Sequence, residues 1–214
     1  MFHKKNFFFM KKDIFVSFLE THLGIKTSEI IPVFEKYHAL LSEENRKINL
    51  VSRKTIEDDY WTIHFLDSLL PIKIFNFSGK KILDFGSGGG LPGIPLKIVF
   101  SSAEVYLLES RMKKAESLKK FIKKLDLKKC FTIVSRLEDL EDEWNDFFDV
   151  IVCRSVKILP KYKKKLFRIL KKDGKIILYK SRKSDDLKLF DKYRSYDVSH
   201  PEIGERKIVE ISKK

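Results

Sequence analysis

The stretch that decides the fold reads KILDFGSGGGLPGIP and spans residues 81–95. A short apolar run leads to Asp84 and Phe85, and four glycines follow within five residues, at Gly86, Gly88, Gly89 and Gly90. Glycine adopts backbone angles that other residues avoid, and proline suits the first turn of a helix. We therefore expect a strand, a tight turn and a helix. Free backbone amides at such a helix start commonly hold a nucleotide-like ligand.

The composition indicates a globular protein with a polyanionic partner. The chain has 214 residues, 43% of them hydrophobic, which suits one domain of ordinary size. Its 44 Lys and Arg against 30 Asp and Glu give a net charge of +14, which favours nucleic acid as the partner. Biased nucleotide composition of a genome would also enrich lysine. No apolar run reaches the roughly 20 residues that span a bilayer, so we expect a cytoplasmic protein.

The chain divides into a helical beginning and an alternating remainder. Residues 1–77 predict a basic tail over 1–12 and a helical cap, with helices over 13–23 and 28–46. A third helix is expected to begin at a capping box formed by Thr55 and Asp58. Residues 78–214 alternate strands (81–85, 104–109, 131–135, 148–153, 175–180) with helices (94–100, 111–125, 159–171), and 196–198 with 207–211 could form a terminal hairpin. This order predicts a Rossmann-like α/β fold with a mostly parallel sheet.

The glycine turn admits two cofactors. Gly88, Gly90 and Gly93 satisfy the dinucleotide pattern, but a lone match of this kind is weak. Because the strand ends before Gly86 and Pro92 interrupts the helix start, a second frame fits better. Asp84-x-Gly86-x-Gly88-x-Gly90 resembles the first motif of S-adenosylmethionine (SAM)-dependent methyltransferases.

Residues at the ends of three further predicted strands fit a SAM pocket. Glu109 ends the second strand, where a carboxylate could accept hydrogen bonds from the ribose hydroxyls. Leu137 and Glu138 follow the third strand and could receive the adenine. Arg154 ends the fourth strand, where an arginine indicates an anionic or carbonyl-rich neighbour. A solvent-facing acid and a structural ion pair are the alternatives for Glu109 and Arg154.

The absence of two motifs from the sequence reduces the number of possible methyl acceptors. The fourth strand is not followed by an Asn or Asp with two prolines, the pattern that serves exocyclic amines. Cys153 has no neighbouring group that would activate it for attack on cytosine C5. Guanine N7 carries a lone pair and no proton, so positioning alone can supply roughly 7–11 kcal/mol of the barrier.

Several segments together are similar to one family. DFGSGGGLPGIPLKIV resembles the signature of the 16S ribosomal RNA guanine-N7 methyltransferases (RsmG), also called glucose-inhibited division protein B. The similarity extends to further short elements: Asn49-Leu50-Val51, His64 with Asp67-Ser68-Leu69, Leu108-Glu109-Ser110 with Lys113-Lys114, Arg154-Ser155, and Glu205-Arg206-Lys207-Ile208-Val209.

The resemblance implies a class I SAM-dependent methyltransferase that modifies a guanine N7 in the decoding region of 16S rRNA. It implies cofactor contacts at Asp84, Gly86, Ser87, Gly88, Leu91, Glu109, Leu137, Glu138 and Arg154. His64, Asp67 and Ser68 share one face of the third helix, where they are expected to join the helical cap to the cofactor domain by packing and hydrogen bonds or, alternatively, to position the guanine. Arg154 is a further candidate for positioning the guanine, and Arg111, Lys113, Lys114 and Lys180 are candidates for contacting RNA. We expect no metal and a monomer. An rRNA-binding assembly factor without catalysis and a small-molecule methyltransferase are the alternatives.

Overall fold

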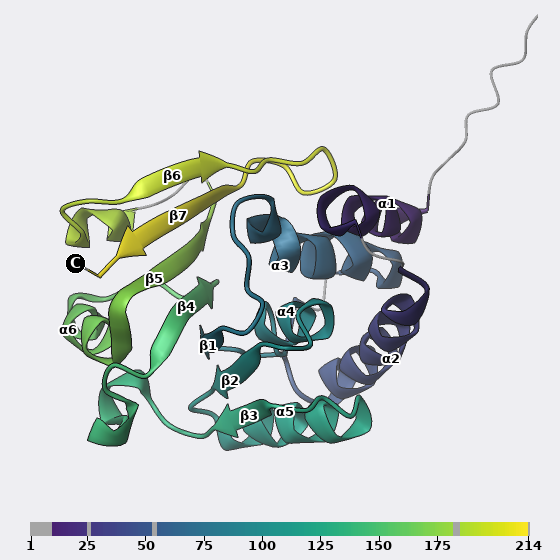
Figure 1. Cartoon of the computed structure of the whole chain (residues 1–214). Helices are drawn as coiled ribbons and strands as arrows, with labels where there is room; N and C mark the ends of the chain where they lie inside the picture. The colour runs from purple at the N-terminus through teal and green to yellow at the C-terminus, as the bar shows by residue number, and fades with distance from the viewer. Residues whose placement is uncertain (1–9, 25–26, 53–54, 182–184, 214) are drawn as a thin grey trace, which may run out of the picture.

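The computed structural model describes residues 10–24, 27–52, 55–181 and 185–213 (Figure 1). These residues form a seven-stranded sheet in the order β3-β2-β1-β4-β5-β7-β6. The strands are β1 Lys81–Phe85, β2 Glu104–Leu108, β3 Cys130–Ile133, β4 Phe148–Arg154, β5 Leu170–Lys180, β6 Arg194–Asp197 and β7 Lys207–Ser212. The first five are parallel to one another, whereas β7 is antiparallel to β5 and β6. The mostly parallel sheet and its terminal hairpin are confirmed.

Helices cover both faces of this sheet (Figure 1). The α-helices are α1 Lys11–Leu23, α2 Ile31–Lys47, α3 Asp67–Leu69, α4 Gly93–Val99, α5 Met112–Lys124 and α6 Pro160–Ile169. Single 3-10 turns lie at Thr27–Glu29 (η1), Glu57–Asp59 (η2), Leu70–Lys73 (η4), Leu137–Asp139 (η5), Asp142–Trp144 (η6) and Asp185–Leu189 (η7), and η3 (Tyr60–Leu66) is a π-helix. The predicted tail over residues 1–12 lies outside the described residues as far as residue 9.

The side chains of β1, β2, β4 and β5 alternate between two cores. On one face, Ile82, Val105 and Val150 pack in a cluster with aromatic residues of the N-terminal helices, including Phe34 and Phe65. On the other face, strand residues such as Leu83 and Ile151 pack against Leu166 and Ile169 of α6. Because the N-terminal helices share this core with the sheet, the cap is packed on one face of it. The division at residue 77 stays a prediction.

The third predicted helix differs from its expected form. No side-chain cap is formed at its start, and the segment winds as a 3-10 turn, a π-helix, a short α-helix and a second 3-10 turn. Residues on every side of it are buried, among them Tyr60, Trp61, Phe65 and Leu66. Contacts on all sides, rather than the capping pattern of Thr55 and Asp58, therefore set its winding. The π turn lies where His64 enters the site.

Two boundaries also differ from expectation. The helix predicted to reach residue 171 ends at Ile169, and β5 begins at once because Leu170 pairs with Phe148. The register then shifts, with Asp173 at a positive φ of 63°, before pairing resumes at Lys175. The first helix, α1, begins at Lys11 rather than at residue 13, and it ends at Leu23 with Gly24 as its C-cap, whose φ of 61° confirms the predicted stop.

Candidate functional site

The glycine turn follows β1 and depends on the absence of side chains. Gly86 has a φ of +78°, and a Cβ there would lie 2.5 Å from Cγ2 of Val156. Below the turn, Asp84 is fully buried, and its Oδ2 accepts a hydrogen bond of 2.9 Å from the Gly93 amide at the start of α4. Burial raises the pKa of Asp84 to about 7. Asp84 therefore supports the turn from beneath and lies away from the solvent.

The amides of this turn are largely occupied, which corrects the expectation of free donors. The Gly86 and Ser87 amides donate to the Leu108 carbonyl at 3.0 and 3.1 Å, and the Gly90 and Leu91 amides donate to the Ser87 carbonyl. The α4 helix has only seven residues. Within the described part of the chain, no group donates to the carbonyls of Gly86 and Gly88. The turn therefore offers mainly carbonyl oxygens, and of its amides from Gly86 to Leu91 only that of Gly89 has no acceptor among the described residues.

A large cleft opens above the turn. It has a volume of about 720 Å³ and is lined by the turn, residues 49–52, His64, Asp67, and the ends of β2 and β4. A smaller cavity of about 190 Å³ lies beside it, bordered by Leu137, Glu138 and Tyr162. Both cavities share Phe85, Gly86, Glu109, Ser110 and Tyr162 in their walls. Together they form one groove along the carboxyl ends of the parallel strands, where ligands of such sheets bind.

Glu109 lies where the two cavities meet. Its side chain is held by two backbone amides, because Oε2 accepts from Gly88 at 3.1 Å and Oε1 accepts from Arg111 at 2.9 Å. The residue is only 8% exposed. Each carboxylate oxygen keeps a second lone pair for an outside donor. A fixed carboxylate at this junction can therefore accept hydrogen bonds from a ligand that fills both cavities.

The smaller cavity combines an apolar wall with an ion pair. Leu137 is 1% exposed and belongs to the core, while Glu138 accepts a hydrogen bond of 2.5 Å from Lys161 of α6. The Lys161 ammonium holds the pKa of Glu138 below its usual range. The ring of Tyr162 meets Phe85 edge-on at 5.3 Å. The cavity can therefore receive a flat ring against apolar groups, with a carboxylate at its edge.

Asp67 joins three distant parts of the chain in the larger cleft. Its Oδ2 accepts from Arg154 Nη1 at 2.9 Å, and its Oδ1 accepts from Arg206 Nε at 2.7 Å. The side chains of Asp67 and Arg154 are 6% and 11% exposed. Ser68 is fully buried, and its hydroxyl donates to the His64 carbonyl at 2.5 Å. Asp67 and Arg154 thus face the cleft, whereas Ser68 has a structural position behind it.

His64 borders the same cleft as a neutral imidazole. Burial and the nearby Arg154 guanidinium lower the pKa of His64 to about 3. Its Nε2 is buried, and no described residue forms a hydrogen bond with it. A histidine with this pKa carries no positive charge at neutral pH. Its ring can therefore border a ligand without adding repulsion to a cationic group.

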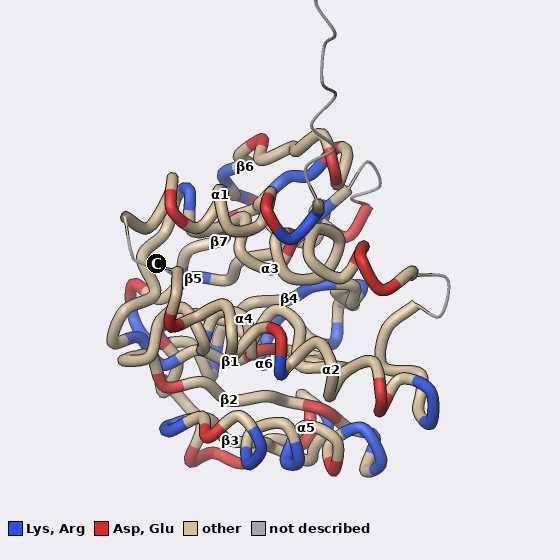
Figure 2. The backbone as a smooth tube through the Cα atoms, turned by 90° about the vertical axis from the view of Figure 1, so that its right-hand side faces the viewer, with Lys and Arg blue, Asp and Glu red and all other residues tan. Residues whose placement is uncertain are grey.

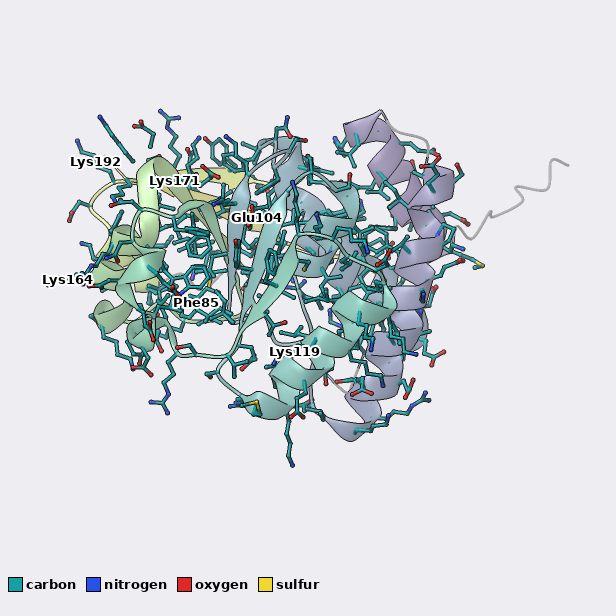
Figure 3. All side chains as sticks on the ribbon, turned by 60° about the horizontal axis from the view of Figure 1, so that its bottom comes forward. Phe85, Glu104, Lys119, Lys164, Lys171 and Lys192 are labelled. Carbon is teal, nitrogen blue, oxygen red and sulfur yellow. The ribbon has the colours of Figure 1, made fainter. Side chains whose placement is uncertain are left out.

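The predicted RNA contacts have different surroundings. Arg111 and Lys113 are exposed at the start of α5, and Arg111 and Lys114 border the cleft. Lys180 instead pairs with Asp186, and its side chain is only 10% exposed. Figure 2 shows Lys and Arg, in blue, recurring along α5. In Figure 3 the side chains of Lys164 and Lys192 point away from the rest of the protein. The ammonium of Lys180 is already neutralised, so the start of α5 is the better placed basic surface.

The sequence reasoning missed several residues of the cleft as site residues. Arg206, Tyr162 and the segment 49–52 all contribute to its walls. Arg206 and Asn49 belong to segments that resemble the family, and this resemblance could have identified them as site residues. The described residues contain no group of three or more acidic, His or Cys side chains that could hold a metal ion. No helix among them is long and apolar enough to cross a membrane.

The fold and the groove define a class of enzyme. A five-stranded parallel core with an antiparallel β7, a glycine turn after β1 and an acid after β2 are the features of a class I SAM-dependent methyltransferase. The structure of a SAM-dependent methyltransferase from Aquifex aeolicus superimposes with a TM-score of 0.57 at 17% identity, covering 73% of this chain and 93% of that one. This likeness supports the fold.

Sequence comparison then identifies the family. Residues 30–204 match the GidB family, described as rRNA small subunit methyltransferase G, and the chain belongs to it. The ribosomal RNA small subunit methyltransferase G of Mesoplasma florum is 39% identical over 168 residues, covering 78% of this chain and 70% of its own. The protein of the same name from Flavobacterium psychrophilum is 36% identical over 186 residues, covering 83% and 87%.

Proposed function

We propose that this enzyme transfers the methyl group of SAM to N7 of a guanine in the decoding region of 16S rRNA. Membership of the GidB family and the names of its relatives support a small-subunit rRNA substrate. The observation that carries the proposal is the groove that passes Glu109, with a small cavity on one side and an open cleft on the other. This shape can hold a nucleoside cofactor and admit a second ligand beside it.

The residues around the groove fit SAM. Glu109 can accept hydrogen bonds from the ribose hydroxyls, and Leu137 with Glu138 can border the adenine. The carbonyls of Gly86 and Gly88 can accept from the ammonium of the amino-acid part. Ser87 and Leu91 belong to the same turn, and Asp84 supports it through Gly93. SAM, when bound, supplies an electrophilic methyl group on a sulfonium.

The cleft can position the acceptor without a general base. Guanine N7 carries no proton, so the transfer needs no base. The neutral His64, with a pKa of about 3, is suited to packing against a ligand rather than to accepting a proton from it. Asp67 holds the Arg154 and Arg206 guanidinium groups on the cleft wall. Arginine donors that bind the polar edge or the phosphate of a guanine nucleotide would orient its ring. Orientation of this kind can supply roughly 7–11 kcal/mol of the barrier.

The basic start of α5 would guide the RNA to this cleft. Arg111 and Lys113 are exposed beside the mouth, and Lys114 contributes to the wall. Phosphate contacts from such residues add affinity that does not depend on base sequence. We assign the enzyme to the cytoplasm as a monomer that acts on 16S rRNA or the small ribosomal subunit.

A pair of matched variants tests the cofactor assignment. Glu104 is the first residue of β2 and Glu109 directly follows its last residue, and of the two only Glu109 borders the groove. We expect Glu109→Gln to weaken SAM binding in calorimetry by about tenfold or more, since the charge-assisted hydrogen bonds are lost. Glu104→Gln should bind SAM like the unmodified protein. Equal SAM affinity of both variants would contradict the role of Glu109, and absence of SAM binding by the unmodified protein would contradict the proposed function.

A further inference from the structure

One buried side chain binds two backbone amides of the segment 49–52. Asn45 lies in the last turn of α2 and is 8% exposed. Its Oδ1 accepts two hydrogen bonds from consecutive backbone amides, from Leu50 at 2.9 Å and from Val51 at 3.0 Å. A single oxygen therefore fixes the direction of the chain just after α2.

This segment lies directly against the glycine turn. A Cβ on Gly89 would be 3.4 Å from both Cβ of Leu50 and Cγ1 of Val51, and the carbonyl oxygen of Leu50 is 3.6 Å from the corresponding position on Gly88. The α2 helix also reaches the turn itself, because the Tyr37 hydroxyl donates to the Gly89 carbonyl at 2.6 Å in the buried interior. One helix thus positions both the turn and the segment that covers it.

The segment contributes to only one part of the groove. Residues 49–52 line the larger cleft, and none of them lines the smaller cavity beside Leu137 and Glu138. With the adenine in the smaller cavity and the ribose at Glu109, the segment would border the amino-acid and methyl end of the cofactor. It would leave the adenosine part untouched.

We propose that Asn45 is a positioning residue, which holds residues 49–52 against the glycine turn and so shapes the end of the cleft that receives the amino-acid part of SAM. The inference rests on the proposed function. Loss of the Asn45 oxygen leaves the two amides without their acceptor in a mostly buried place, and buried donors seldom stay unpaired. The segment must then move to reach water, which removes a wall from the cleft.

Three variants of the full chain separate this role from a general structural one. Asn45→Leu has a similar volume and no acceptor, whereas Asn45→Asp keeps an oxygen that can accept both amides. We expect Asn45→Leu to weaken SAM binding in calorimetry by about tenfold or more, since an unpaired buried amide carries a penalty of that size. Its affinity for adenosine should stay unchanged. Asn45→Asp should bind both ligands like the unmodified protein, and Asn45→Ala replaces the leucine variant if that chain does not fold.

A second measurement needs no ligand. Amide hydrogen exchange of Leu50 and Val51 should become about tenfold faster or more in Asn45→Leu and stay slow in Asn45→Asp. Unchanged exchange, unchanged SAM affinity, or an equal loss of SAM and adenosine affinity in Asn45→Leu would overturn the proposal. If the unmodified protein binds no SAM, the proposed function fails, while the exchange of these two amides still decides whether Asn45 holds the segment.

Discussion

The buried carboxyl of Asp84 predicts an unusual dependence of stability on pH. Burial raises its pKa from the ordinary 3.8 to about 7 in the folded protein. Between these values the unfolded chain releases the proton and the folded chain keeps it, so this group lowers the free energy of unfolding as the pH rises. At about 1.4 kcal/mol per pH unit, the full effect is about 4 kcal/mol, complete once the pH exceeds about 7. The Asp84→Asn side chain does not titrate, so any pH-independent change that the substitution makes to the free energy of unfolding cancels when the difference between the two proteins is compared at two pH values.

Urea unfolding of both proteins at several pH values measures this effect. The stability of Asp84→Asn relative to the unmodified chain should rise by about 4 kcal/mol between pH 4 and pH 8. Glu210→Gln is the matched control, with a second buried acid. Burial raises the pKa of Glu210, but the Lys175 ammonium and the Tyr196 hydroxyl outweigh it and hold this pKa below its usual range. The ionised Glu210 therefore contributes less to the free energy of unfolding as the pH falls, which is the opposite direction from Asp84. A pH-independent difference between Asp84→Asn and the unmodified chain would refute the reasoning.

Three further predictions concern the groove and its surroundings. Gly86→Ala should lose SAM binding in calorimetry because its Cβ meets Val156, whereas Gly79→Ala, with a φ of +67° and no atom within 4 Å, should lose only about 1–2 kcal/mol of stability; equal binding by both variants would contradict the contact. Asp67→Asn should cost about 3 kcal/mol in urea unfolding because two largely buried guanidinium groups lose their shared carboxylate, whereas Asp142→Asn, paired with the exposed Arg168, should cost under about 1 kcal/mol; similar costs would argue against the network. Replacing Lys113 and Lys114 by alanine should reduce the slope of log affinity for small-subunit rRNA against log salt by about 1–2, and replacing Lys123 and Lys124 at the far end of α5 should leave it unchanged; the reverse result would move the RNA surface.

Local patterns in the sequence were sufficient to predict the strands and helices of the parallel core. The apolar run before Gly86 and the helix start at Gly93 are set by residues close together in the chain, and β1 has the predicted bounds. The resemblance to SAM-dependent methyltransferases indicated Glu109, which borders both cavities at the edge of the sheet where ligands bind; its role toward SAM stays a prediction. The family resemblance named His64 and Arg154 at the cleft, which the folded chain brings to the same wall.

Contacts between distant parts of the chain could not be read from local patterns. Asp67 and Arg206 are 139 positions apart, and only folding of the terminal hairpin brings them within 2.7 Å. Lys180 resembled a free basic residue until the fold placed Asp186 beside it. The glycine count also predicted free amides, although the Leu108 carbonyl and the Glu109 carboxylate occupy three of them. Such satisfaction of buried donors depends on tertiary structure.

The reaction assigned to this enzyme is methyl transfer to a guanine N7 in the decoding region of 16S rRNA. Chemical cleavage at N7-methylguanosine, read by sequencing of 16S rRNA, tests it in a strain that lacks this gene and in the same strain carrying the unmodified gene or its Glu109→Gln form. We predict that the methyl group is missing from one decoding-region guanine in the deletion strain, restored by the unmodified gene, and restored poorly by the variant. An N7-methylguanosine that persists unchanged in the deletion strain would contradict the account.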